Sequence, residues 1–335
     1  MNEFNYHRAL NVNDAIARAG GVNSRFIAGG TTQLDLMKCG VETPDNLIDI
    51  KHLSALNDIS VTAGTLRIGA LAHMSEVAAD ARCRGLAPVI YESLWQAASP
   101  QIRNMATIGG NLCQRTRCVY FRDPATFSAC NKRRPGSGCS ALHGINRNYA
   151  VLGASESCVA LYPGDLAVAL TAFDARVILR NAAGRERRVP IEDFYLLPGN
   201  TPDKEHDMAA DEMIIAVEVP IVPALRRSHY LKVRDRTSYE FAAASTAVGL
   251  DLEGSVIRDI RIAMGGIATK PWRAHAVEAA LRGKPFTEGE ISQAASLITA
   301  DARPLEHNRF KIVLAPRVIT RALLTAGQLT PGETS

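Results

Sequence analysis

Ala28-Gly29-Gly30-Thr31-Thr32-Gln33-Leu34 follows a short apolar run at residues 25–28 and precedes a run of helical composition at residues 34–38. Adjacent glycines let a backbone approach a ligand closely, and free N–H groups at the start of a helix favour phosphate. By itself the stretch fits either a phosphate-binding turn or an ordinary turn between a strand and a helix. It lacks the spacing G-x-G-x-x-G, which argues against a doubly wound NAD-binding fold.

A second glycine pair stands in the stretch Thr107-Ile108-Gly109-Gly110-Asn111-Leu112. Its glycines again permit close approach of the backbone, and the amide of Asn111 can hydrogen-bond a hydroxyl or a carbonyl group. Each turn alone is a weak signal. Two of them in one α/β chain that has no P-loop lysine motif favour a single large cofactor with phosphate groups.

The composition is that of an ordinary globular protein, with 335 residues of which 47% are hydrophobic and 21% are charged. No stretch reaches the roughly 18 consecutive apolar residues of a membrane-spanning helix, and residues 1–8 show no signal-peptide pattern. We therefore expect no membrane span, and a chain that stays in the cytoplasm or is exported attached to another protein.

The formal net charge of +4 is spread along the chain, and the densest basic runs are residues 132–134 and 185–188. Aromatic residues make up 6% of the chain and none of them interleave with these runs. A surface that stacks single-stranded nucleic acid needs such aromatic residues. The basic runs are therefore interpreted as solvated loops, and nucleic-acid binding is not expected.

The pattern along the chain predicts two domains. Residues 1–222 contain a small α/β unit, up to about residue 58, and a second unit in which residues 86–98 have helical composition. Pro220 and Pro223 mark the boundary. Beyond it, three β-like runs at 228–234, 241–252 and 256–263 precede three helical runs, which predicts an α+β domain over residues 223–335.

Five of the seven cysteines fall within residues 113–163, a stretch with little periodicity that is expected to be a long loop. These are Cys113, Cys118, Cys130, Cys139 and Cys158. Their spacings are too wide for a zinc ribbon and do not match ferredoxin motifs. From spacing alone, an iron–sulfur cluster, a zinc ion and unliganded thiols all remain open.

Five fragments of the chain, in this order, resemble the FAD-binding fragments of the molybdenum hydroxylase flavoproteins. They are residues 28–34, 107–112, 164–166, 212–220 and 230–234. The resemblance covers nearly the whole chain. It implies an α+β protein with a two-lobed FAD-binding domain of the PCMH type, with lobes at about 1–58 and 59–222. It also implies a C-terminal domain with a three-stranded antiparallel sheet and helices.

By the same resemblance, residues 27–33 hold the pyrophosphate of FAD, and Asp165 accepts hydrogen bonds from the ribityl chain. Ile214 packs on the flavin ring, and Lys232 favours the reduced flavin anion. Gln114 and the glycine before Asp165 depart from the residues of some relatives. The implied cofactor-binding set is Phe26, Ile27, Ala28, Gly29, Gly30, Thr31, Thr32, Gln33, Ala98, Thr107, Gly110, Asn111, Gln114, Asp165, Ile214 and Lys232.

Part of this family carries a cysteine insertion that binds a [4Fe–4S] cluster, and the insertion here is most similar to that of bacterial aldehyde oxidoreductases. Cys113 directly follows the flavin turn, so its backbone is expected to belong to the FAD site. The cluster ligands are therefore expected to be Cys118, Cys130, Cys139 and Cys158. The neighbouring Arg117, Lys132 and Arg133 are expected to offset the negative charge of the cluster.

The function implied by the resemblance is that of an electron-transfer subunit, without catalytic residues of its own, in a heterotrimeric molybdenum-dependent aldehyde oxidoreductase. Partner subunits supply the molybdenum cofactor and the [2Fe–2S] clusters, and FAD passes the electrons to an external acceptor. The complex is expected in the periplasm, exported by a partner's signal, with the cytoplasm as the alternative.

Two other functions remain open at this point. A self-contained flavin oxidoreductase would act directly on a small substrate, with an acid or base drawn by residue type from His73, His143, Tyr239 and Glu240. A cysteine-cluster domain that binds zinc or nucleic acid would carry no flavin.

Overall fold

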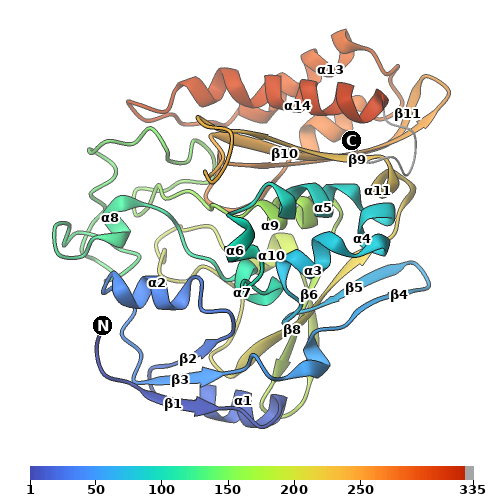
Figure 1. Cartoon of the computed structure of the whole chain (residues 1–335). Helices are drawn as coiled ribbons and strands as arrows, with labels where there is room; N and C mark the ends of the chain where they lie inside the picture. The colour runs from blue at the N-terminus through green and yellow to red at the C-terminus, as the bar shows by residue number, and fades with distance from the viewer. Residues whose placement is uncertain (329–335) are drawn as a thin grey trace.

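The N-terminal lobe is a small parallel sheet with helices beside it, as seen in the computed structural model, which describes residues 1–328 (Figure 1). Its strands β1 (Asn5–Arg8), β2 (Ser24–Ile27) and β3 (Asn46–Asp49) lie in the order β1-β3-β2. Helix α1 (Val12–Ala19) is capped by the side chain of Asn11, and α2 (Gln33–Lys38) follows the first glycine turn. The short 3-10 helix η1 (Ser54–Leu56) ends the lobe.

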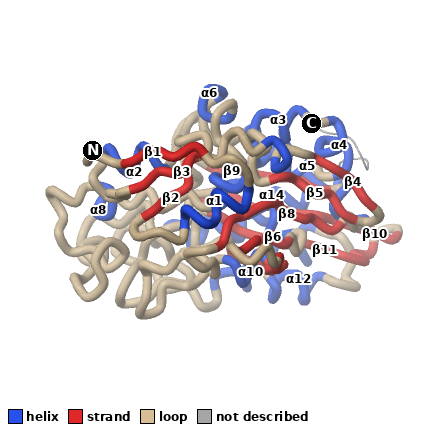
Figure 2. Tube along the Cα trace, turned by 90° about the horizontal axis from the view of Figure 1, so that it is seen from below, coloured by secondary structure: helices blue, strands red, loops and turns tan. Residues whose placement is uncertain are grey.

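The second lobe contains an antiparallel sheet with the strand order β4-β5-β8-β6-β7. The first lobe lies against it through α1, as Figure 2 shows from below, and Ile16 packs with Ile178 and Met213. The strands are β4 (Ile59–Thr62), β5 (Thr65–Gly69), β6 (Arg176–Asn181), β7 (Glu186–Pro190) and β8 (Glu212–Pro220).

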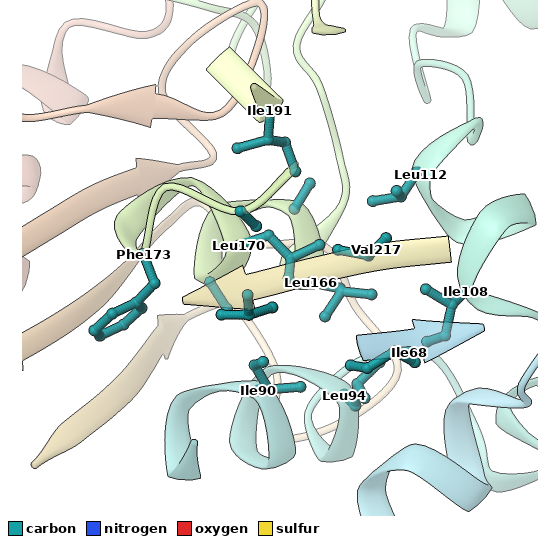
Figure 3. Close-up of a cluster of buried hydrophobic side chains, with 14 of the residues drawn as sticks. Ile68, Ile90, Leu94, Ile108, Leu112, Leu166, Leu170, Phe173, Ile191 and Val217 are labelled. Atoms are coloured by element: carbon teal, nitrogen blue, oxygen red, sulfur yellow. The ribbon is translucent and has the colours of Figure 1, made fainter. Parts of the chain in front are cut away.

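Short helices cover this sheet and form the main core with it (Figure 3). Helix α9 is apolar on all sides, and all eight of its residues are buried because it lies between α5 and the C-terminal sheet. The helices are α3 (Met74–Ala79), α4 (Ala81–Leu86), α5 (Pro88–Trp95), α6 (Pro100–Arg103), α7 (Ile108–Leu112), α9 (Asp165–Ala172) and α10 (Ile191–Phe194).

The cysteine segment, residues 113–163, leaves the second lobe after α7 and returns at α9. Apart from the four-residue helix α8 (Val119–Arg122), it has no helix or long strand, in agreement with the predicted loop. It still has a core of its own, in which Tyr120, Ala141, Tyr149 and Val159 are buried.

The C-terminal domain has a layer of helices on an antiparallel sheet of order β12-β11-β10-β9 (Figure 1). The sheet has three long strands, as predicted, and a further two-residue edge strand, β12, which the sequence analysis missed. The strands are β9 (Ser228–Val233), β10 (Ala244–Glu253), β11 (Val256–Gly265) and β12 (Trp272–Arg273). The helices are α11 (Pro223–Arg226), α12 (His275–Leu281), α13 (Glu288–Ala295), η2 (Ser296–Thr299) and α14 (Phe310–Gln328).

The chain passes from the five-stranded sheet to the C-terminal sheet between Pro220 and Ser228, on either side of the predicted boundary at 222/223. The last seven residues of the predicted C-terminal domain lie outside the described residues. None of the helices within residues 1–328 combines the length and the apolar character that crossing a membrane requires.

Gly29 is the point at which the first lobe touches the second most closely. A Cβ atom at this position would lie 1.7 Å from the carbonyl oxygen of Met105, so an alanine forces two backbones apart. We expect Gly29→Ala to lower the free energy of unfolding by about 1–3 kcal/mol, measured by urea denaturation.

The matched control is Gly85→Ala in α4, where the added methyl group meets no atom within 4 Å. This exposed helical glycine has no special conformation, so alanine is expected to raise stability by about 0.5–1 kcal/mol. Equal effects of the two substitutions would contradict the close packing of the lobes at Gly29.

Candidate functional site

A cavity of about 310 Å³ opens where the two lobes meet the C-terminal domain. It is called the large cavity below, because it is the larger of the two spaces that the glycine turns line. The first lobe supplies Thr31 and Thr32, the second lobe supplies Gly110 and Asn111, and the C-terminal domain supplies Lys232. The two glycine turns, which are far apart in sequence, therefore line one site. Of the predicted cofactor-binding residues, this cavity collects Thr31, Thr32, Ala98, Gly110, Asn111, Gln114, Asp165 and Lys232.

Several polar groups near this cavity have no hydrogen-bond partner among the described residues. The side-chain oxygen Oδ1 of Asn111 and the amide nitrogen Nε2 of Gln33 are buried and unpaired. A buried polar group without a partner is costly, so such groups point to a polar ligand. Ala98 has a φ of 49°, a left-handed conformation that is rare for alanine and that often marks a ligand site.

Asp165 and Lys232 form a buried ion pair on the cavity wall, with 2.7 Å between Lys232 Nζ and Asp165 Oδ2. Tyr230 donates its hydroxyl proton to Asp165 Oδ1 at 2.7 Å and is also hydrogen-bonded with Ser245. Burial raises the pKa of Asp165 above its ordinary value, although Lys232 and Tyr230 both favour the ionised form. The pair thus presents an acceptor and a cation side by side on a buried wall.

A second, more apolar chamber of about 120 Å³ lies on the other side of the second glycine turn. Gly110 lines both spaces, so they meet at this turn. Ile214, from β8, forms part of its wall. Of the predicted set, the chamber collects Phe26, Ala28, Thr107, Gly110 and Ile214, and the remaining residues Ile27, Gly29, Gly30 and Gln33 line neither space.

These features fit the parts of FAD. The turns offer backbone and hydroxyl donors for a diphosphate, the ion pair can bind the hydroxyls of a ribityl chain, and the apolar chamber suits a flat ring. Gly109 packs tightly in this arrangement, because a Cβ atom there would lie 3.1 Å from the Cβ of Ala70 and would require a small shift.

The four cysteines predicted as ligands line a third, small cavity inside the cysteine segment. Cys118, Cys130, Cys139 and Cys158 all reach it, and Tyr120 and Phe121 form its apolar wall. Cys113 does not; it lines the apolar chamber next to Ile214. The thiols of Cys139 and Cys158 are hydrogen-bonded to each other, which lowers the pKa of Cys139.

Within residues 1–328, no three His, Cys, Asp or Glu side chains are placed to hold one metal ion. In a [4Fe–4S] cluster each cysteine binds a different iron atom, so convergence on one point is not needed. The shared cavity of four thiols is the observation that fits such a cluster.

The basic residues around the cysteines make specific bonds. Arg117 pairs with Asp35, and Lys132 pairs with Glu205 at 2.6 Å. Arg133 donates to backbone carbonyl oxygens, including that of Tyr120. Of the three, Lys132 lines the cysteine cavity. The hydrogen bond with Cys139 and burial raise the pKa of Cys158, and the charge of Lys132 opposes this shift.

Of the candidates for a direct oxidase, Tyr239 and Glu240 line the large cavity. His73 caps α3 and bonds Glu76, and His143 is exposed in the cysteine segment. Tyr230 was not predicted as a site residue, although its place two residues before Lys232 on a strand puts both side chains on one face. Arg122, which lines the cavity, was not predicted either.

His206 lies in the buried contact between the cysteine segment and the second lobe. Burial, together with the charges of Arg115 and Lys132, lowers its pKa to about 4. The unfolded chain binds this proton near pH 6.5 and the folded chain does not, so stability falls as the pH drops from about 6.5 to 4. The shift corresponds to roughly 3 kcal/mol.

We therefore expect His206→Gln to flatten the dependence of stability on pH in this window. Urea midpoints between pH 7 and 4.5 provide the measurement, with His143→Gln, at an exposed histidine, as the control. An unchanged slope for His206→Gln would contradict the assignment.

Comparison with known proteins agrees with this site. A family described as "FAD binding domain in molybdopterin dehydrogenase" matches residues 2–222, and the "CO dehydrogenase flavoprotein C-terminal domain" matches residues 229–326. The aldehyde oxidoreductase FAD-binding subunit PaoB of Escherichia coli is 44% identical over 333 residues, which cover 97% of this chain and 99% of PaoB.

A carbon monoxide dehydrogenase medium chain of Hydrogenophaga pseudoflava is 27% identical over 96% of both chains. A solved structure of carbon monoxide dehydrogenase from the same organism superposes with a TM-score of 0.75 at 25% identity, over 97% of this chain and 98% of that one. The predicted α+β fold class is thereby confirmed. This chain belongs to the FAD-binding subunits of the molybdenum hydroxylase family of oxidoreductases.

Proposed function

We propose that this chain is the electron-transfer subunit of a molybdenum-dependent aldehyde oxidoreductase and that it carries a [4Fe–4S] cluster beside its FAD. The observation that carries the proposal is the contact between the two candidate cofactor sites. Arg117 lines the large cavity and the next residue, Cys118, lines the cysteine cavity. Consecutive residues of the chain therefore line the two candidate sites.

In the FAD site, Thr31 and Thr32 offer hydroxyl donors to the phosphate groups, and Asp165 accepts from the ribityl hydroxyls. Lys232 keeps a positive charge next to the cofactor, which favours its reduced, anionic form. FAD supplies the capacity to take up and release one or two electrons, and the protein sets its position and its electrostatic surroundings.

In the cysteine cavity, Cys118, Cys130, Cys139 and Cys158 would hold the cluster, and Cys113 would remain free. The cluster supplies one-electron chemistry when bound. Tyr149 donates a hydrogen bond to the Cys118 sulfur over 3.2 Å, and the N–H of Ala160 approaches the Cys158 sulfur at 3.4 Å. Such hydrogen bonds to sulfur adjust the reduction potential of iron–sulfur sites.

The remaining parts of the enzyme belong to partner chains in this proposal. Substrate oxidation takes place on a molybdenum-cofactor subunit, and a further subunit holds [2Fe–2S] clusters. The aldehyde substrate class is supported by the 44% identity with a subunit of an aldehyde oxidoreductase. We expect the complex in the periplasm, and activity confined to the cytosol of the native host would refute that location.

The decisive experiment is purification of this chain together with its partners, followed by assay of FAD, iron and molybdenum. An aldehyde added without oxygen should bleach the flavin absorbance of the complex and leave the isolated chain unchanged. Bleaching of the isolated chain would instead support the self-contained oxidoreductase, which Tyr239 and Glu240 in the cavity wall make worth testing. A colourless chain that carries zinc would refute both.

A further inference from the structure

Two arginines of the cysteine segment face the cavity of the FAD site. Arg117 and Arg122 lie on either side of α8's first turn, and both line the same cavity as Thr31 and Thr32. Gln114 and Pro163 of the same segment also line this cavity, and the two arginines are the charged residues that the segment contributes to its wall. Their presence there raises the question of what they bind.

Both guanidinium groups bond one carboxylate, that of Asp35 in α2. Arg117 Nη1 lies 3.1 Å from Asp35 Oδ2, and Arg122 bonds the same oxygen. The two positive guanidinium groups and the single negative carboxylate together carry a net charge of +1. The carboxylate stands three residues after Thr32, so this positive excess lies beside the first glycine turn.

The other charged side chains that line the cavity each have a partner within the protein. Lys232 is paired with Asp165, and Glu240 accepts a hydrogen bond from the backbone N–H of Arg236. Over the whole lining, three cationic and three acidic side chains balance. The positive excess is therefore confined to the neighbourhood of Asp35.

Each arginine also keeps a donor without a partner. Arg117 Nε and Arg122 Nη1 are buried and make no hydrogen bond within the described residues. The guanidinium of Arg117 is held in place by the ring of Phe241, 4.9 Å away, and Arg122 is 16% exposed. Both side chains line the cavity and stay partly exposed, and guanidinium groups fixed in such a wall are well suited to bind phosphate oxygens.

We propose that Arg117 and Arg122 bind the diphosphate of FAD beside the first glycine turn, an inference that rests on the proposed function. The cysteine segment then has two tasks, since it holds the four thiols and also completes the flavin site. By linkage, bound FAD stabilises the folded segment, and a disordered segment weakens FAD binding.

The test compares Arg117→Met and Arg122→Met with the unchanged full-length chain. Loss of a charge-assisted hydrogen bond should weaken FAD binding roughly ten- to a hundredfold per substitution, measured through the fluorescence of added FAD. Binding of ADP to the FAD-free chain should weaken by a similar factor, and binding of adenosine should not change. Arg134→Met, at an exposed arginine of the same segment, is the control and should bind all three as before.

The outcomes separate the possibilities. Unchanged FAD and ADP binding in both variants would overturn the inference, and so would weaker FAD binding with unchanged ADP binding, because the arginines would then contact the flavin part. An unchanged chain that binds no FAD would instead refute the proposed function itself.

A further variant covers the case in which the methionine variants fail to fold. Asp35→Asn removes the competing carboxylate and leaves both arginines in place, so ADP binding should tighten severalfold, and more so at low salt. Unchanged or weaker ADP binding by a folded Asp35→Asn chain would count against the proposal.

Discussion

Asp165→Ala should abolish FAD retention and lower the free energy of unfolding by about 3–5 kcal/mol. The substitution leaves the ammonium group of Lys232, whose side chain is 1% exposed, without its partner. It also removes the acceptor of the Tyr230 hydroxyl. Gel filtration followed by the absorbance of bound flavin measures retention, and urea denaturation of the FAD-free chain measures stability.

The control for Asp165→Ala is the double variant Asp165→Asn with Lys232→Met. It removes both charges and keeps the volumes, so most of the lost stability should return while FAD binding stays weak. If Asp165→Ala retains FAD to the same extent as the unchanged chain, the carboxylate is no part of the flavin site. If the double variant is as unstable as the single one, the cost does not arise from the unpaired ammonium group.

Serine at any of the four predicted ligand cysteines should remove the iron of the [4Fe–4S] cluster from the purified complex and leave the iron of the partner's [2Fe–2S] clusters in place. A cluster bound by four thiolates rarely survives with a hydroxyl in place of one of them. The chain offers a matched control in Cys113→Ser, because Cys113 lies in the apolar chamber and outside the cysteine cavity. Iron assay and the absorbance near 400 nm provide the measurement.

The comparison between two cysteines decides the assignment. Loss of iron in Cys113→Ser, together with its retention in Cys158→Ser, would show that Cys113 is a ligand and Cys158 is not. Retention of the full iron content in all five variants would show that this segment holds no cluster. Circular dichroism serves as the folding control in each case, because Cys113 lines the apolar chamber of the FAD site and FAD content is not independent of this residue.

The elements that could be predicted from the sequence are those with strong local patterns. The glycine turns and the three long strands of the C-terminal sheet are of this kind. Residues 86–98 were expected to form one helix, and the structure instead ends α4 at Leu86 and begins α5 at Pro88. Proline fits the first turn of a helix and breaks its interior, so Pro88 starts a new helix.

Contacts between distant segments could not be predicted in this way. The edge strand β12 has two residues, too few to show any periodicity, and exists because Trp272 and Arg273 pair with β11. Arg117 was expected beside the cysteines, and no role was predicted for Arg122. Their bonds to Asp35 span more than 80 residues of chain, and nothing in the local sequence signals them.

The two ends of the cysteine segment lie side by side. A Cβ atom at Gly164 would lie 2.8 Å from the side-chain nitrogen of Gln114, and α7 contacts α9 directly. A short connection between these points closes the gap at little cost in chain entropy. The segment could thus be gained or lost at these two ends, at the expense of its contacts with the nucleotide and of Val151 and Leu152, which pack in the C-terminal core.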